Sequence, residues 1–240
     1  MSLFKKDKFG HILIIKKILI IIIGIFSYKK FFGEKKIKIE GTSNIPNKKL
    51  NNVLFISNHQ TYFLDAIGII HVLNSTINGN KNNLNILSYF LKPKLNTYYV
   101  AAKETMNSGI IPKILSYTGA ILIERTWREN GKKIKRAVNN NDIININKAL
   151  KEGWLITFPQ GTTKNSGKIR KGTSHIILNN QPLVIPIVIN GFADKFEKKS
   201  LSIKNPEKEI SITFKKPLKI NYKKDSIDDI TLKIKKSLEL

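Results

Sequence analysis

The chain contains no cysteine among its 240 residues. Disulfides, thiol nucleophiles and cysteine-based metal sites are therefore excluded, and the composition fits a reducing compartment. The glycine-rich nucleotide loop and the G-x-S-x-G turn of serine hydrolases are also missing from the sequence. The 4 histidines are scattered, without a partner at metal-ligand spacing, so we expect no metal ion and no bound cofactor.

Acidic residues are scarce: 17 Asp and Glu stand against 42 Lys and Arg, a formal net charge of +25. Such a chain is attracted to nucleic acid, to anionic membrane lipids or to phosphorylated substrates. Cys/His fingers, basic-region heptads and aromatic RNP-type strands are missing, so we expect no nucleic-acid partner. The apolar amino terminus favours anionic membrane lipids. A non-enzymatic basic protein that binds membrane or nucleic acid through charge alone is the alternative from another functional class.

Long hydrophobic runs are also missing. The longest run, Ile18–Phe26, has nine residues, whereas a spanning helix needs about 20. Lys16 and Lys17 would lie near the middle of a span, where a cation costs about 2.5–3.5 kcal/mol. We therefore predict that residues 1–33 form a membrane-associating helix lying in one leaflet, with its lysines at the headgroups. A tilted span and a buried core helix are the alternatives.

Residues 34–240 have the pattern of one α/β domain, in which short apolar runs alternate with helical stretches. The predicted strands are Ile37–Glu40, Val53–Ile56, Thr97–Ala102, Ala120–Ile123, Trp154–Phe158, Leu183–Ile189 and Glu209–Phe214. The predicted helices are Asp65–Leu73, Ile110–Tyr117, Asp142–Lys151, Gly172–Leu178 and Ser226–Leu240. This alternation predicts a largely parallel central sheet flanked by helices. Pro186 predicts a bulge or an edge strand, and residues 74–85 predict an exposed loop.

Polar residues follow three of the predicted strands where each strand ends. His59 comes after the first of these strands, Arg125 after the second, and Gly161 and Thr162 after the third. Active sites in such sheets gather at the carboxyl ends of the strands. We therefore expect a base, a cation and a backbone-rich turn at one edge of the sheet. Asp65 is the candidate partner that orients the imidazole of His59.

Four ordered blocks of the sequence resemble the glycerolipid acyltransferases, and most of all the bacterial lysophosphatidate acyltransferases. The blocks are Asn58-His59 with Asp65, Gly119 to Arg125, Phe158 to Thr162, and Val184 to Ile187. The resemblance implies transfer of an acyl group from acyl-CoA or acyl-ACP (acyl carrier protein) to lysophosphatidic acid, giving phosphatidic acid. It also implies a membrane anchor and a place at the cytoplasmic face of the cell membrane. Another lysophospholipid, or a lyso-amino-acid lipid, is the alternative acceptor.

The resemblance also implies roles for residues of this chain. His59 is the expected general base, and Asp65 is expected to hold its tautomer. The residues expected to bind substrate are Asn58, Arg125, Gln160, Gly161, Thr162 and Lys171. Among these, Arg125 is the expected contact for the acceptor's phosphate, because its planar fork suits bidentate binding.

Three departures from the family pattern matter. Five residues, rather than four, separate His59 from Asp65. On one continuous helix they would lie about 240° apart, so this segment must be a loop that enters the helix at Asp65 if the pair cooperates. Gln160 replaces the usual glutamate, and Thr163 stands where an arginine is common. We expect the phosphate contacts of that arginine to pass to basic residues that follow: Lys164, Lys168, Arg170 or Lys171.

Overall fold

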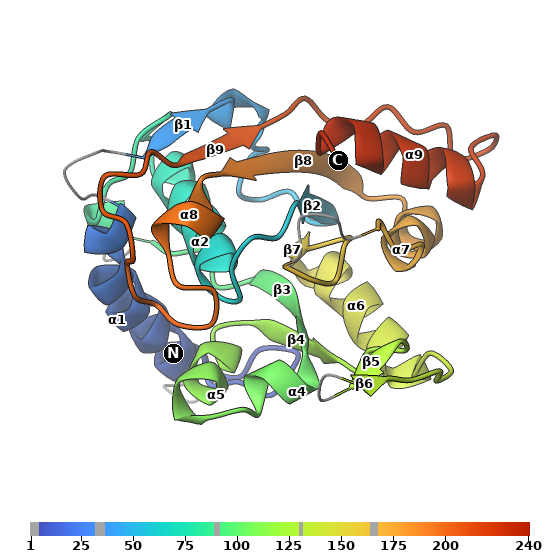
Figure 1. Ribbon diagram of the computed structural model, residues 1–240, viewed down its shortest axis with the longest axis horizontal. Coiled ribbons are helices and arrows are strands. Elements are labelled where there is room, and N and C mark those ends of the chain that lie inside the picture. The colour runs from blue at the N-terminus through green and yellow to red at the C-terminus, as the bar shows by residue number, and fades with distance from the viewer. Residues whose placement is uncertain (1–4, 32–36, 89–91, 130–131, 164–167) are drawn as a thin grey trace.

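A seven-stranded sheet forms the centre of the protein, in the order β1-β9-β8-β2-β7-β3-β4 (Figure 1). The computed structural model describes residues 5–31, 37–88, 92–129, 132–163 and 168–240. The strands of the sheet are β1 (Lys38–Glu40), β2 (Val53–Ser57), β3 (Thr97–Ala102), β4 (Ala120–Ile123), β7 (Trp154–Thr157), β8 (Leu183–Asn190) and β9 (Ser211–Phe214). Strands β8, β2, β7, β3 and β4 are parallel, whereas β9 is antiparallel to β8 and parallel to β1. The predicted α/β fold with a largely parallel sheet is confirmed.

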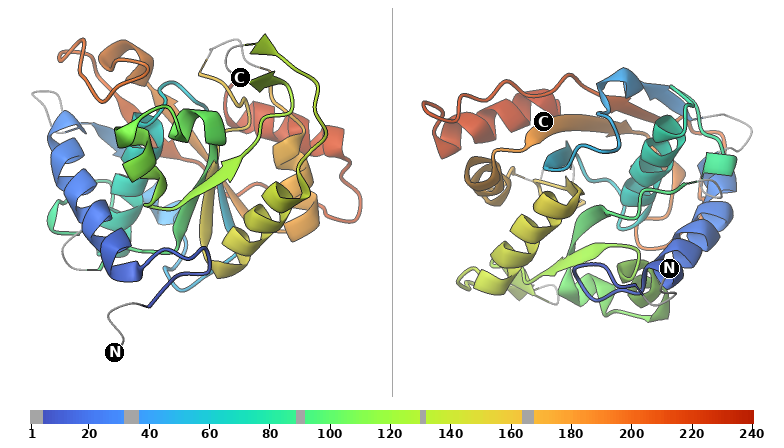
Figure 2. Two further views of the ribbon diagram at one scale, coloured as in Figure 1. Left: turned by 90° about the horizontal axis from the view of Figure 1, so that it is seen from below. Right: turned by 180° about the vertical axis from the view of Figure 1, so that it is seen from behind.

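Helices cover both faces of the sheet, as further views from below and from behind show (Figure 2). One face carries α1 (Leu13–Phe31), α2 (Leu64–Ile77) and α8 (Phe192–Lys195), and the other carries α6 (Asn140–Glu152), α7 (Gly172–Asn180) and α9 (Ile227–Ser237). The shorter elements are η1 (Thr42–Asn44), α4 (Lys103–Met106), α5 (Ile110–Ser116) and the two-stranded hairpin β5 (Arg128–Glu129) and β6 (Lys132–Lys133). Successive residues of β2 point to opposite faces. Val53 and Phe55 therefore join one core cluster, and Leu54 and Ile56 join the other.

Of two sequence expectations about local structure, one is wrong and the other is confirmed in part. Strand β8 is an interior strand, because it pairs with β2 on one side and with β9 on the other. The carbonyl of Pro186 accepts from Lys215 N at 2.8 Å, just beyond the last pair of the β8–β9 ladder. The N–H and C=O of a strand residue lie on the same side, so the N–H that proline lacks would also be on the β9 side, past the end of that ladder. Pro186 is therefore tolerated in this strand. The segment 74–85 is a partly exposed loop from residue 78 onward, whereas its first residues belong to α2. The loop is held by Asn82, whose Oδ1 accepts from Thr42 Oγ1 at 2.8 Å.

Helix α1 packs against α2, and one stripe of its residues is buried against the domain: Lys16, Ile20, Gly24, Ser27 and Phe31. Ser27 Oγ lies 2.8 Å from His71 Nε2 on α2. Lys16 is only 1 % exposed, and its Nζ lies 3.0 Å from Asp7 Oδ2. The expectation that this lysine reaches lipid headgroups is therefore wrong, because its charge is paired inside the protein.

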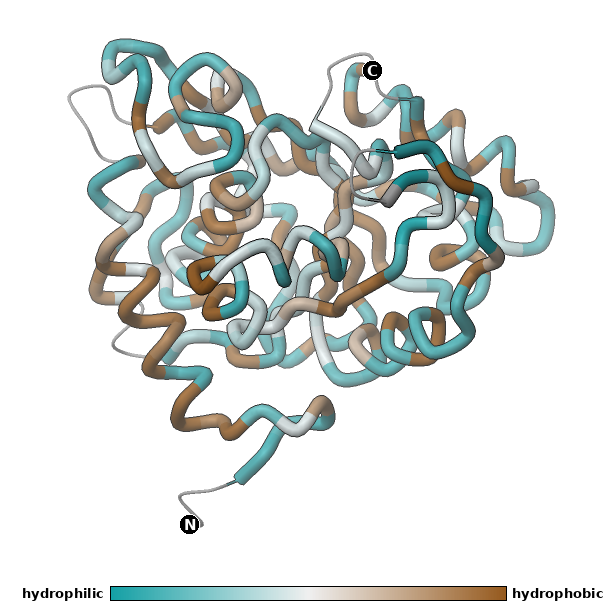
Figure 3. The backbone as a smooth tube through the Cα atoms, turned by 60° about the horizontal axis from the view of Figure 1, so that its bottom comes forward, coloured by the Kyte–Doolittle hydropathy of each residue, from teal (hydrophilic) through white to brown (hydrophobic). Residues whose placement is uncertain are grey.

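Helix α1 is apolar along most of its length (Figure 3), and large apolar residues outside the buried stripe are exposed. Its exposed large apolar residues are Ile14, Ile15, Ile18, Ile22, Ile25 and Phe26. Helix α5 exposes Ile110, Ile111 and Ile114. Within the described residues, none of the helices has the length and apolar content needed to cross a bilayer. Whether α1 lies in a membrane surface stays a prediction.

Candidate active site

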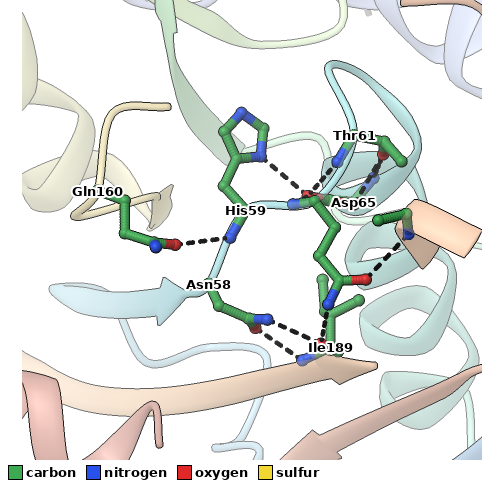
Figure 4. Close-up of polar contacts among 8 residues, drawn as sticks. Asn58, His59, Thr61, Asp65, Gln160 and Ile189 are labelled. Atoms are coloured by element: carbon green, nitrogen blue, oxygen red, sulfur yellow. Dashed lines mark hydrogen bonds and ion pairs between the residues drawn. The ribbon is translucent and has the colours of Figure 1, made fainter. Parts of the chain in front are cut away.

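The turn between β2 and α2 brings His59 and Asp65 together (Figure 4). Asp65 lies in the first turn of α2 and is fully buried. Its Oδ2 accepts from His59 Nδ1 at 2.9 Å, from the Gln60 N–H at 2.5 Å and from the Thr61 N–H at 3.0 Å. The chain from residue 58 to residue 63 is a turn that leads into the helix, so the extra residue before Asp65 does not separate the pair.

Thr61 locks this turn from its side chain. Its hydroxyl donates to Asp65 Oδ1 at 2.7 Å and accepts from the Asp65 N–H at 3.1 Å. Both carboxylate oxygens are thus occupied by donors from residues 59–61. The carboxylate orients the imidazole because it is itself held from several directions.

The imidazole of His59 is also held by stacking. Its ring lies 4.2 Å from the ring of Phe158, with an angle of 21° between the two planes. Because Nδ1 faces the carboxylate of Asp65, the neutral ring carries its proton there, and Nε2 keeps its lone pair. In Figure 4 this second nitrogen is directed away from Asp65. His59 lines a cavity and has a side chain that is 16 % exposed, so a ligand can reach Nε2.

Asn58 and Gln160, both predicted to bind substrate, hold the backbone around His59. The amide of Asn58 donates to the Ile189 carbonyl at 2.7 Å and accepts from the Ile189 N–H at 2.8 Å (Figure 4). Gln160 Oε1 accepts from the His59 N–H at 3.2 Å. Neither residue lines the apolar cavity that His59 faces, but both line a smaller pocket that His59 also lines, so their predicted contact with substrate stays a prediction.

Arg125, Gly161 and Thr162 all line this cavity, as their predicted roles require. Arg125 Nη2 lies 2.9 Å from Glu104 Oε1 and donates to Thr105 Oγ1 at 3.0 Å, so α4 holds the guanidinium at the wall. Gly161 has a φ of +61°, in the region that favours glycine. Its turn is closed by the hydrogen bond from its N–H to the Phe158 carbonyl, at 2.9 Å.

The basic residues that follow the turn have different fates. Lys171 Nζ lies 2.7 Å from Asp228 Oδ1 of α9, both side chains are exposed, and neither lines the cavity. Lys171 thus forms a surface ion pair, and its predicted substrate contact stays a prediction. Lys168 is exposed, and Lys164 lies outside the described residues. Arg170 is the basic residue of this group that lines the cavity.

The cavity has a volume of about 540 Å³ and reaches from His59 to the amino end of β3. Its walls are largely apolar and come from α1, α2, α5 and β3, with side chains such as Ile20, Ile67, Leu115 and Tyr99. Two other residues of the lining are affected by burial, which lowers the pKa of His71 to about 3 and that of Lys94 to about 8. The space between the α1–α2 layer and the sheet has the shape and chemistry to hold a hydrocarbon chain.

The sequence interpretation missed several residues of the site. Thr61 precedes Asp65 by four residues, a spacing that allows a side-chain link at a helix start. Phe158 was placed in a strand, with no sign that it would stack on a histidine almost a hundred residues away. Trp127 lines the cavity next to Gly161, and no pattern in the sequence marks this contact.

Comparison with known proteins identifies the family of the chain. The family model described as Acyltransferase matches residues 36–190, more than half of the chain. The chain belongs to this family. The enzyme also resembles the crystal structure of the 1-acyl-sn-glycerophosphate (LPA) acyltransferase PlsC from Thermotoga maritima, with a TM-score of 0.59 and 17 % identity over 93 % of this chain and 78 % of that chain. A search among curated proteins found no match.

The acyltransferase family and its α/β fold agree with the resemblance of the four sequence blocks. The structural likeness is a likeness of fold, because the sequence identity is 17 %. The roles of His59, Asp65 and Arg125 stay predictions. Their positions at one cavity are the structural basis on which these roles can be tested.

Proposed function

We propose that this acyltransferase moves a fatty acyl group from a thioester to the free hydroxyl of lysophosphatidic acid, giving phosphatidic acid for phospholipid synthesis. One observation carries the proposal: the His59–Asp65 pair, 2.9 Å from Nδ1 to Oδ2, lies beside a deep apolar cavity. An oriented imidazole activates a hydroxyl group, and an apolar cavity accepts a hydrocarbon chain. The family match and the similarity of fold to an LPA acyltransferase support the same reaction.

In the proposed reaction His59 is the general base. Its Nε2 accepts the proton of the acceptor's hydroxyl as that oxygen bonds to the thioester carbonyl carbon. Asp65 keeps the other proton on Nδ1 and stabilises the imidazolium that forms. The tetrahedral intermediate then collapses, the carbon–sulfur bond breaks, and the imidazolium gives its proton to the departing thiolate. The substrate supplies the nucleophile, so the enzyme needs no serine of its own.

Arg125 is the proposed contact for the phosphate of the acceptor. Its guanidinium lies in the cavity wall, held by Glu104 and by the hydroxyl of Thr105. A planar guanidinium matches the oxygen geometry of a phosphate. Gly161 and Thr162 lie in the same wall, where their turn brings backbone groups close to the substrate.

The donor we propose is acyl-CoA or acyl-ACP, whose thiol is a better leaving group than an alcohol. The acyl chain enters the apolar part of the cavity, between α1, α2 and β3. We also propose that the enzyme lies at the cytoplasmic face of the cell membrane. The exposed isoleucines of α1 and α5 then meet the acyl region, and the net charge of +25 attracts the anionic lipids.

The function is tested with purified enzyme, an acyl thioester and a panel of lysolipids. We expect release of free thiol with lysophosphatidic acid and formation of phosphatidic acid. Thiol release only with another lysophospholipid, or with a lyso-amino-acid lipid, would change the acceptor. No release with any acceptor, together with tight salt-sensitive binding to nucleic acid, would instead favour the non-enzymatic alternative.

A further inference from the structure

Arg170 places an uncompensated positive charge in the cavity wall. Its Nε is buried and has no hydrogen-bond partner. Across the described ranges, no carboxylate is within ion-pair distance of its guanidinium. The backbone N–H of Arg170 donates to the Pro159 carbonyl at 2.9 Å. Burial lowers the pKa of Arg170, and the nearby charge of Arg125 lowers it further. A buried polar atom without a partner is costly, so the arrangement calls for a ligand.

Trp127 fixes where this guanidinium lies. The Cζ of Arg170 is 3.5 Å from the centre of the indole ring, a close cation–π contact. The same indole packs on the turn of Gly161, where a Cβ would come within 2.6 Å of Trp127 Cη2. Gly161 therefore makes room for the indole, and the indole supports the arginine. The position of Arg170 is built by three separate segments of the chain.

Arg125 and Arg170 face the same cavity but differ in their partners. Arg125 is paired with Glu104 at 2.9 Å. Arg170 rests on an aromatic ring, which attracts its charge without neutralising it. Two neighbouring guanidinium charges repel each other, but a dianion bound between them attracts both and offsets that repulsion. A phosphate monoester has two charges and enough oxygen atoms to bind both forks.

We propose that Arg170, held on Trp127, is the second cation of a phosphate subsite in which Arg125 is the first, and that this subsite selects acceptors with a phosphate monoester. The inference rests on the proposed function and deepens it, because it names which acceptors the enzyme accepts. The reacting hydroxyl then lies between the phosphate subsite and His59, because Arg125, Arg170 and His59 line one cavity.

The first test is kinetic and compares the wild-type enzyme with Arg170→Gln. We expect the KM for lysophosphatidic acid to rise about 10- to 100-fold, the range expected for a charged hydrogen bond, while the KM for the thioester stays within twofold. Trp127→Leu should raise the same KM in the same direction. Lys235→Ala is the control: it removes one positive charge from the exposed side of α9 and should leave both constants unchanged.

An unchanged KM for lysophosphatidic acid in Arg170→Gln would overturn the inference, and so would an equal rise in both constants. These outcomes differ from failure of the proposed function, in which the wild-type enzyme itself does not acylate lysophosphatidic acid. A variant that does not fold, as judged by circular dichroism, is replaced by a binding test on the wild-type protein. Glycerol 3-phosphate should change the Trp127 fluorescence saturably, and glycerol should not. The signal should vanish in Trp127→Phe. No change in a wild-type enzyme that acylates lysophosphatidic acid would also overturn the inference.

Discussion

Replacing His71 with glutamine tests whether α1 is part of the folded domain. His71 is fully buried on α2, and its Nε2 lies 2.8 Å from Ser27 Oγ of α1. It also lines the cavity. Burial lowers its pKa from 6.5 to about 3, so the folded protein keeps the ring neutral between these values. In the unfolded chain His71 binds a proton in this range. The folded protein, with α1 packed on α2, therefore loses stability relative to the unfolded chain as the pH falls.

The size of this effect follows from the shift in pKa. Below pH 6.5 the unfolded state binds more protons than the folded state, so the free energy of unfolding decreases as the pH decreases. Between pH 8 and pH 5 the loss from His71 alone is about 2 kcal/mol. Glutamine does not titrate and keeps a polar group near Ser27. The variant should therefore lose about 2 kcal/mol less than the wild type over this range.

The assay is urea unfolding followed by circular dichroism at pH 8 and pH 5. The change in unfolding free energy between the two pH values is compared, which removes any constant cost of the substitution. His175→Gln is the matched control, because His175 is exposed on α7, and it should keep the pH dependence of the wild type. An equal loss of stability in the wild type and His71→Gln would refute the reasoning, because it would mean that His71 is not buried as a neutral ring.

Three further substitutions test other parts of the site. Asp65→Asn should lower kcat about 10³-fold or more in steady-state assays, because His59 loses the group that holds its tautomer; a loss below tenfold in a folded variant would contradict this role. Gly24→Leu puts a side chain at the cavity wall and should shift product chain length, measured by mass spectrometry, toward shorter acyl groups; an unchanged profile would place the acyl chain elsewhere. Gly161→Ala should lower the thermal unfolding midpoint at a cost of about 1–3 kcal/mol, because its Cβ meets Trp127 at a φ of +61°; an unchanged midpoint would mean that the turn is free to move.

The strands could be predicted because each is a short apolar run between polar turns. The bounds of β3 and β4 match their predicted runs, and β2 and β7 differ by one residue. Periodicity is a local property, so it needs no knowledge of the partners. The approach of His59 to Asp65 could be stated only as a condition, because the turn depends on the hydroxyl of Thr61, whose contact the sequence does not display.

Contacts between distant segments could not be predicted. The contact of Asn58 with the backbone could not be foreseen because its partner, Ile189, lies 131 residues away on β8. Lys16 looked like a headgroup lysine because the pairing with Asp7 forms only when the segment before α1 folds back. Arg170 could not be distinguished from Lys168 or Lys171 until Trp127 was seen beneath it. In each case the decisive neighbour is set by the packing of the whole sheet.

The most direct test of the proposed chemistry is thiol release from an acyl thioester in the presence of lysophosphatidic acid, compared between the wild-type enzyme and His59→Ala. The removal of the base should lower the rate at least about 10³-fold, while circular dichroism and the unfolding midpoint stay close to those of the wild type. A folded His59→Ala variant that releases thiol at a rate close to that of the wild type would contradict the assignment of His59 as the general base.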